Sequence, residues 1–311
     1  MLFQQRLNPW SQLALLFGLC AAGMLVSSVI SVIVGNLVLH VPITSLADEL
    51  MKPGNVSVNR LLQVFTTFLV MAVPAFLVTY LSGGDTMSTL GLRQKSGLVQ
   101  LGIVVLMVFF GFMLSDALSV LNKMIPVSAG AEKIFKEMED TYSDQVMAIA
   151  SMKSFADYFL SLVVLAVLPA IFEEMLFRGT FQQIMIAVTK NSFAGILITS
   201  IIFSAFHISF YGFLSRLFLG VMLGYIFYMS KNLWLSIVAH FINNAYSLTV
   251  IYLYSQSGKA ATDAFEESFP WYYGIIGSVA MIFLFLFFKK ESDKQLITNN
   301  QDRNYNHERL V

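Results

Sequence analysis

Eight long apolar segments dominate the 311-residue chain and limit its architecture more than any other feature. They run approximately over residues 10–39, 60–82, 97–122, 155–189, 193–210, 214–229, 232–254 and 271–288. About 20 apolar residues suffice to cross a bilayer as a helix, and a helix satisfies its own backbone hydrogen bonds in lipid. The sequence therefore predicts an all-α, polytopic membrane helix bundle with about eight transmembrane helices.

The composition indicates one membrane domain. Only 12% of the residues are charged and the mean hydropathy is +0.70, whereas soluble domains carry roughly twice that share of charge. The net charge is zero, so we expect no nucleic-acid partner. Cys20 is the only cysteine, which rules out a disulfide framework. We expect a single membrane domain over residues 1–290, followed by a polar, disordered tail over residues 291–311.

The distribution of lysine and arginine predicts the orientation in the membrane. Eight spans would place both termini on one side, together with ten lysines and arginines, against eight on the other side. Short cytoplasmic connections carry an excess of these residues. We therefore expect a multi-pass integral membrane protein, of the inner membrane in a bacterial cell, with bilayer lipid around it and both termini in the cytoplasm.

Residues 126–150 are polar with scattered apolar positions. This pattern is typical of an amphipathic helix on the surface, and it also suits a lid over a cavity. The sequence does not decide between the two.

Five ionisable side chains lie well inside the apolar segments, where each charge costs at least a few kcal/mol. They are Glu173, Glu174, Arg178, His207 and His240. Glu174 and Arg178 are four residues apart, so they lie on one helix face and can form an ion pair. Glu173 is rotated by about 100° from Glu174, which leaves it as the carboxylate free to take up a proton.

Polar side chains from two further apolar helices would complete a site around Glu173. His207 and His240 can exchange a proton near neutral pH, and Asn244, one turn after His240, can donate a hydrogen bond to an oxyanion. Phe203, one turn before His207, can wall off the site. Such groups serve amide hydrolysis, and buried acid and histidine relays also serve proton-coupled transport. The residues alone leave both functions open, although the halves of the chain lack the internal symmetry of many transporters.

The order of three short motifs resembles a known family. "EEMLFR", "FSAFH" and "HFINN" resemble the EExxxR, FxxxH and HxxxN motifs of the CPBP (CAAX protease/Abi) intramembrane endopeptidases, which include the Ras-converting type II CAAX prenyl endopeptidases. The resemblance covers roughly residues 155–250, and each motif position is present. It implies hydrolysis of a peptide bond in a membrane-associated peptide or protein, with prenylated CAAX proteins as one option. Some relatives resemble bacteriocin self-immunity proteins, so a self-immunity membrane protein is an alternative function for this chain.

The resemblance also implies a role for each residue. Glu173 would activate water that His207 helps to hold, while His240 and Asn244 would stabilise the oxyanion. Glu174 and Arg178 would support the site. The substrate would arrive from the membrane or its cytoplasmic edge.

A metal is the remaining question for this site. We favour a mechanism without a cofactor, because the chain has no HExxH motif and a buried glutamate already supplies a base. If zinc were bound, Glu173, His207 and His240 would be its ligands.

The depth of the two histidines presents a further problem. His240 follows Lys231 by nine residues, whereas His207 follows Lys190 by seventeen, although their helices should run the same way. Either the helix of residues 155–189 breaks near Gly179, or the loop "SFYGFLSR" dips inward.

Overall fold

The computed structural model describes residues 6–149, 152, 154–257 and 270–308, and these contain helices and no strand. The α-helices are α1 (Pro9–Leu39), α2 (Leu46–Leu50), α3 (Val56–Thr67), α4 (Val73–Ser82), α5 (Thr86–Thr89), α6 (Leu98–Lys123), α7 (Ala129–Ile149), α8 (Phe155–Ser161), α9 (Leu168–Leu176), α10 (Gln182–Thr189), α11 (Ser192–Ala205), α12 (Phe213–Ser230), α13 (Leu233–Gln256) and α14 (Tyr272–Glu308). Three π-helical turns join consecutive helices into longer rods, at Phe68–Ala72, Leu162–Val167 and Phe177–Phe181. Two short 3₁₀ turns flank α2, at Ile43–Ser45 and Pro53–Asn55.

Six helical stretches are long and apolar enough to cross a membrane, which confirms the predicted helical membrane bundle. They are Pro9–Leu39, Val56–Ser82, Leu98–Lys123, Phe155–Thr189, Phe213–Ser230 and Tyr272–Gln301. The other two predicted spans correspond to α11, which has only 14 residues, and to α13. His240, Asn243 and Asn244 make α13 less apolar than its neighbours. The total of eight spans therefore stays a prediction.

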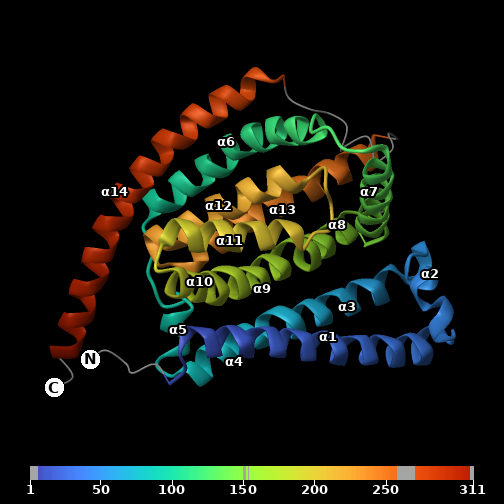
Figure 1. Cartoon of the computed structure of the whole chain (residues 1–311), viewed down its shortest axis with the longest axis horizontal. Coiled ribbons are helices and arrows are strands. Elements are labelled where there is room, and N and C mark those ends of the chain that lie inside the picture. The colour runs from blue at the N-terminus through green and yellow to red at the C-terminus, as the bar shows by residue number, and fades with distance from the viewer. Residues whose placement is uncertain (1–5, 150–151, 153, 258–269, 309–311) are drawn as a thin grey trace.

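The bundle has two edges with further helices between them, and one helix lies across an end (Figure 1). α6 and α14 pack side by side along one edge, while α11 packs between α10 and α12 in the middle. α1 and the α3–α4 rod form the opposite edge. α7 lies across the end of the bundle that is opposite to the start of α1 and the end of α14.

Two tight turns close the end opposite to α7. Lys190 and Lys231 adopt left-handed backbone conformations, with φ of 52° and 55°, and so terminate α10 and α12. The following residues, Asn191 and Asn232, accept hydrogen bonds from the first turns of α11 and α13. An asparagine at this position satisfies one of the free N–H groups of a helix start. The two "KN" pairs therefore fold α10–α11 and α12–α13 into helical hairpins.

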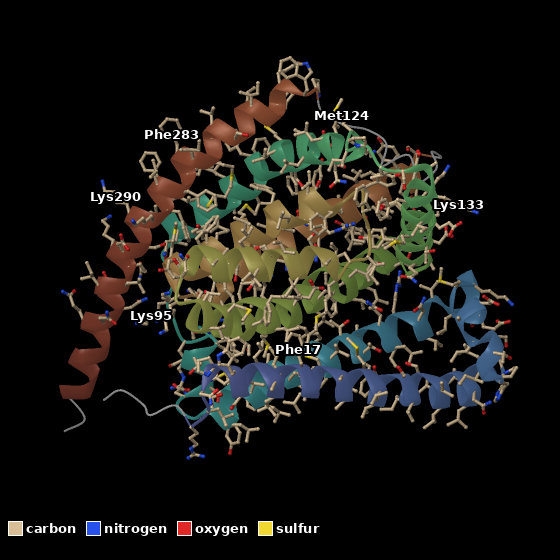
Figure 2. All side chains as sticks on the ribbon, in the orientation of Figure 1. Phe17, Lys95, Met124, Lys133, Phe283 and Lys290 are labelled. Carbon is tan, nitrogen blue, oxygen red and sulfur yellow. The ribbon has the colours of Figure 1, made fainter. Side chains whose placement is uncertain are left out.

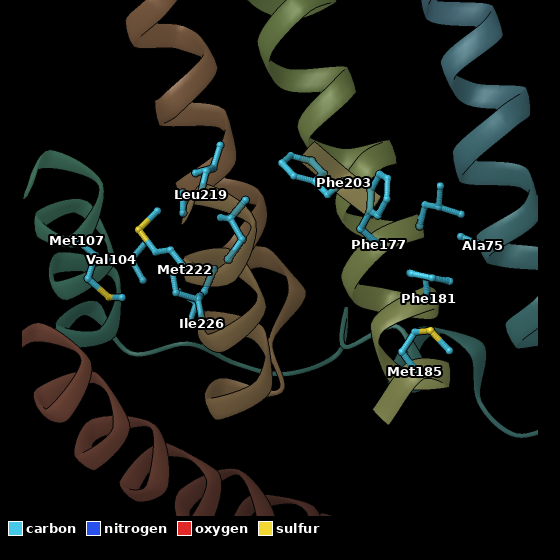
Figure 3. Packing of buried hydrophobic residues seen from close by; sticks show 14 of the residues in the cluster. Ala75, Val104, Met107, Phe177, Phe181, Met185, Phe203, Leu219, Met222 and Ile226 are labelled. Carbon is cyan, nitrogen blue, oxygen red and sulfur yellow. The ribbon is translucent and has the colours of Figure 1, made fainter. Parts of the chain in front are cut away.

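The core joins the rod of α8–α10 to its neighbours (Figure 3). Phe177 and Phe181 pack near Ala75 of α4, while Met222 of α12 lies near Met107 of α6. The outer surface remains apolar: Phe283 of α14 is 57% exposed and points away from the bundle (Figure 2). Soluble proteins rarely expose large contiguous apolar surfaces, so this pattern fits contact with lipid.

The prediction of a disordered tail over residues 291–311 is wrong for most of that range. α14 continues to Glu308, and the last three residues lie outside the described part of the chain. Ser292 and Asn299 are buried, and the amide of Asn299 donates a hydrogen bond of 3.1 Å to the carbonyl of Lys95. Polar side chains that suggested disorder instead contact the polar loop before α6.

Candidate active site

The acidic turn of α9 lies between two π-helical turns. The first, Leu162–Val167, comes just before Pro169, and the second, Phe177–Phe181, contains Arg178. Proline lacks an N–H group and its ring clashes with the carbonyl four residues earlier, so a wider turn relieves the clash. The expected break near Gly179 is therefore absent, because the helix continues through a π-turn. Single π-turns of this kind are frequent at functional sites.

Glu174 and Arg178 form the ion pair that their spacing predicts. Arg178 Nη1 lies 2.9 Å from Glu174 Oε1, and both side chains are 0% exposed. The same oxygen accepts a hydrogen bond of 3.0 Å from His240 Nδ1. Glu174 thus fixes α13 relative to α9, a contact that the sequence does not reveal. Removing either charged partner would leave the other charge buried and uncompensated.

Two further contacts fix the guanidinium of Arg178. Its Nη2 donates a hydrogen bond of 3.2 Å to the carbonyl of Gly220, and its Cζ lies 4.5 Å from the centre of the Phe203 ring. A Cβ at Gly220 would come within 3.1 Å of the Cα of Ser200, so only glycine allows α11 and α12 to approach this closely. Gly220 and Gly224 are small residues four apart, which is a known signal of close helix packing.

Glu173 remains the less constrained of the two carboxylates. Its Oε2 lies 3.8 Å from His240 Nε2 and has no hydrogen-bond partner among the described residues. Its side chain is 15% exposed, whereas that of Glu174 is completely buried. Glu173 also lines a cavity, although the Oε2 atom itself is buried.

His207 lies on the same cavity, just beyond the end of α11. Its Nδ1 is 2.9 Å from the carbonyl of Phe203. A carbonyl can only accept a hydrogen bond, so Nδ1 carries the proton and Nε2 of the neutral ring is left as an acceptor. The loop that follows α11 supplies Phe206, His207 and Ile208 to the cavity wall, which agrees with the alternative that this loop dips inward.

Phe203 lies near both histidines. Its ring centre lies 5.0 Å from that of His207 and 5.7 Å from that of His240. Phe203 therefore packs against both histidine rings.

Asn244 lies one turn beyond His240 on α13. Its Oδ1 accepts a hydrogen bond of 3.3 Å from Asn243 Nδ2. This bond uses the oxygen and leaves the amide N–H groups of Asn244 as donors. The structure places Asn244 on the helix that carries His240, and Asn244 is hydrogen-bonded to Asn243.

The cavity has a volume of about 500 Å³ and extends from Glu173 toward α7. Residues of α3, including Gln63 and Thr67, form one wall. α7 contributes Ile134, Met138 and Gln145, among others. That α3 reaches the site is not predictable from the sequence, because Gln63 and Thr67 belong to no recognisable motif. For residues 126–150, the position of α7 beside the cavity favours the lid over a merely superficial helix.

The donor arrangement does not suit the zinc site that Glu173, His207 and His240 could have formed. Among the described residues, no three His, Cys, Asp or Glu side chains are grouped closely enough to hold a metal ion. The Phe203 ring also packs against both imidazole rings. A tetrahedral zinc site needs its ligands to converge at about 2 Å from one point. We therefore derive no step through a metal.

Comparison with known proteins adds one finding. Residues 155–246 match the family model described as type II CAAX prenyl endopeptidase Rce1-like. No curated protein and no solved structure shows a significant match to the chain. The matched range contains all three motifs, from Glu173 to Asn244, which confirms the resemblance seen in the sequence. The chain therefore carries a domain of the Rce1-like type II CAAX prenyl endopeptidase family.

Proposed function

We propose that this protein is an intramembrane endopeptidase in which Glu173 activates water against a peptide bond. The observation that carries the proposal is the contrast between adjacent acids. Oε1 of Glu174 is held by both Arg178 and His240 and its side chain is fully buried, whereas Glu173 lies 3.8 Å from His240, is 15% exposed and lines a cavity. The family of the matched domain supports endopeptidase activity, and the roles below are our proposal.

Two acceptors are available to hold the attacking water. The Glu173 carboxylate and His207 Nε2 both face the cavity and both accept hydrogen bonds. A water molecule between them donates one proton to each and points a lone pair toward the substrate. A base positioned in this way typically contributes a factor of about 10² to 10⁴ in rate.

The reaction then proceeds with balanced proton transfers. Glu173 takes a proton from the water as its oxygen attacks the carbonyl carbon, and the π electrons move onto the carbonyl oxygen. The tetrahedral oxyanion collapses, the C–N bond breaks, and the leaving nitrogen takes the proton back from Glu173.

His240 and Asn244 are the proposed donors to the oxyanion. Glu174 accepts the proton of His240 Nδ1, so a protonated ring presents Nε2–H to the site. Glu173, Glu174 and Arg178 together carry one net negative charge, and one proton on either His240 or Glu173 makes the group neutral. The transfer of a proton from Glu173 to His240 thus prepares the base and the oxyanion donor together, without changing the buried charge.

The position of the cavity limits the sides from which a substrate could enter. The cavity lies toward α7, at the end of the bundle opposite to the start of α1 and the end of α14. With both termini in the cytoplasm, as the lysine and arginine distribution predicts, α7 would face the other side of the membrane. Cytoplasmic termini and entry from the cytoplasmic edge are therefore incompatible unless the substrate enters sideways from the lipid. A reporter fused after α14 and a tag inserted at Gly130 would distinguish these arrangements.

The direct test is cleavage by purified protein in lipid nanodiscs, with a peptide library that includes prenylated CAAX peptides. Glu173→Gln should lower turnover by at least about 10²-fold. Glu137→Gln is the matched control because Glu137 is another carboxylate of the same cavity. It has no role in the proposed mechanism, so this variant should retain turnover. Equal turnover in the wild type and in Glu173→Gln would refute the mechanism.

Two further assays address the remaining alternatives. Activity that a chelator removes and zinc restores would show that a metal is required after all. If no peptide is cut and proteoliposomes instead accumulate a solute with protons, the protein is a transporter.

A further inference from the structure

We propose that α7 is a hinged cover over the catalytic cavity and that the segment directly after His207 latches it. This inference rests on the proposed function for the meaning of the cavity. The motion itself can be measured without any substrate.

The inner face of α7 closes one side of the cavity. Ile134, Met138, Thr141 and Gln145 line the cavity, and they recur at spacings of three and four residues. That period places them on one face of the helix. Any peptide that reaches Glu173 from this end of the bundle must therefore pass α7.

Three contacts attach the middle of α7 to the segment of residues 209–216. The rings of Phe135 and Phe210 stack with their centres 4.0 Å apart. Ser209 donates a hydrogen bond of 2.6 Å to Glu139.

The third contact comes from the first turn of α12. The guanidinium of Arg216 lies 4.8 Å from the centre of the Tyr142 ring, and its Nη1 is buried without a hydrogen-bond partner among the described residues. Together these contacts form a latch of three side-chain pairs.

Apart from the latch, α7 is weakly held. No residue from Ala129 to Ala148 is buried, in contrast to every helix that surrounds Glu174. Only the C-terminal end reaches a hydrophobic cluster, where Val146 and Met147 pack beside Leu248 and Ile251. Regions with few buried contacts open at the lowest free energy. The anchored end is therefore the hinge, and the latched middle is the part that swings.

A strained residue connects the latch to the catalytic histidine. Ile208, between His207 and Ser209, has a φ of 49°, a left-handed conformation that a β-branched residue rarely adopts. Such strain persists only when surrounding contacts hold it in place. Release of Ser209 and Phe210 from α7 would allow Ile208 to relax and His207 to turn. Closure of α7 thus both covers the cavity and sets the orientation of His207.

The motion is testable by electron spin resonance distance measurements in a Cys20→Ala background. One spin label replaces the outward-pointing Lys133 on α7 and the other replaces Lys290 on α14 (Figure 2). A matched pair at Lys123 of α6 and Lys290 reports a distance within the packed bundle. We expect the α7 pair to show a second, longer distance whose population grows severalfold in the latch variant Phe210→Ala/Arg216→Gln. The control pair should not change in that variant, which also verifies that it folds.

A reversible cross-link tests the functional consequence. Glu139→Cys and Ser209→Cys, joined by a short bis-methanethiosulfonate reagent, should lower cleavage by about tenfold or more until a reductant is added. The matched pair Lys136→Cys/Asp140→Cys lies within α7, at exposed residues that do not line the cavity, and should leave cleavage unchanged. A single narrow α7 distance in both wild type and latch variant would overturn the hinge. Full activity of the cross-linked protein would overturn the requirement for opening. If the wild type cuts no peptide, the distances still decide the hinge.

Discussion

Two ion pairs with the same helical spacing occupy opposite environments in this molecule. Glu174 and Arg178 on the α9 rod are 2.9 Å apart and completely buried, while Lys133 and Glu137 on α7 are 3.9 Å apart with side chains 80% and 67% exposed. Water screens the second pair, and such exposed pairs contribute little to stability. The first pair is shielded from water and shares its carboxylate with His240. Identical spacing therefore specifies a structural centre in one helix and a solvated face in the other.

The α9 rod and α7 also differ in how many buried contacts hold them in place. The buried pair touches α11, α12 and α13 through Phe203, Gly220 and His240. The exposed pair belongs to a helix that has no buried residue over its first twenty positions. The fixed charges thus belong to the part of the site that must not move, and the solvated charges to the part that we infer moves.

The largest effect should come from Arg178→Gln. This change leaves Glu174 buried without its cation, which typically costs about 3–5 kcal/mol in the free energy of unfolding. Thermal unfolding in detergent and the yield of folded protein provide the measurement. Glu174→Gln/Arg178→Met, which removes both charges, should recover part of the loss. If Arg178→Gln unfolds at the wild-type temperature, the pair is not structural.

Substitutions of the two adjacent acids, Glu173 and Glu174, should differ in their effect on the free energy of unfolding. Glu174→Gln breaks contacts with both Arg178 and His240 and should lower the free energy of unfolding by about 1–3 kcal/mol or more. Glu173→Gln removes a carboxylate oxygen that has no hydrogen-bond partner, so its stability should equal or exceed that of the wild type. Both variants are isosteric and adjacent, so each controls for the other. Equal destabilisation by both would remove the distinction between a structural and a catalytic acid.

Gly220→Ala tests the packing around the buried pair. The added methyl group would press on Ser200, and overpacking of this kind costs about 1–3 kcal/mol. Gly102→Ala on α6 is the matched control, because a Cβ there meets no atom within 4 Å. Unfolding midpoints of the two variants in the same detergent would show the difference. A Gly220→Ala protein as stable as Gly102→Ala would mean that α11 and α12 are less closely packed.

The smallest effect is expected at the exposed pair. Lys133→Gln should change the free energy of unfolding by less than about 0.5 kcal/mol, because water already solvates both charges. The same unfolding assay supplies the measurement. A loss comparable to that of Arg178→Gln would contradict the contrast between the two helices.

Much of the fold follows from the sequence because lipid leaves few alternatives. Apolar length alone predicts the six spans, and the spacing of Glu174 and Arg178 predicts their ion pair. The three motifs also identify the matched domain. These features depend on local periodicity or on residue identity, which a single sequence contains.

The remainder depends on contacts between distant residues. The sharing of Glu174 with His240 joins positions 66 residues apart, and no spacing rule predicts it. The tail was mistaken for a disordered segment because composition does not show that Asn299 meets the loop at Lys95. The position of α7 beside the cavity cannot be predicted for the same reason, because an amphipathic pattern does not indicate which surface the helix packs against.

The π-turns on either side of Glu173 also set the rotational phase of the helix. A π-turn accommodates one extra residue, and each residue of an α-helix advances the direction of a side chain by about 100°. Deletion of one residue from Leu162–Val167 would convert that turn to ordinary α-helix and rotate everything before it relative to everything after it. Ser161, whose hydroxyl accepts a hydrogen bond of 2.7 Å from Arg60 of α3, would then no longer face that arginine while Glu173 faced the cavity. The extra residue in the π-turn Leu162–Val167 therefore lets Ser161 face Arg60 while Glu173 faces the cavity. A regular α-helix that is one residue shorter could make only one of these two contacts.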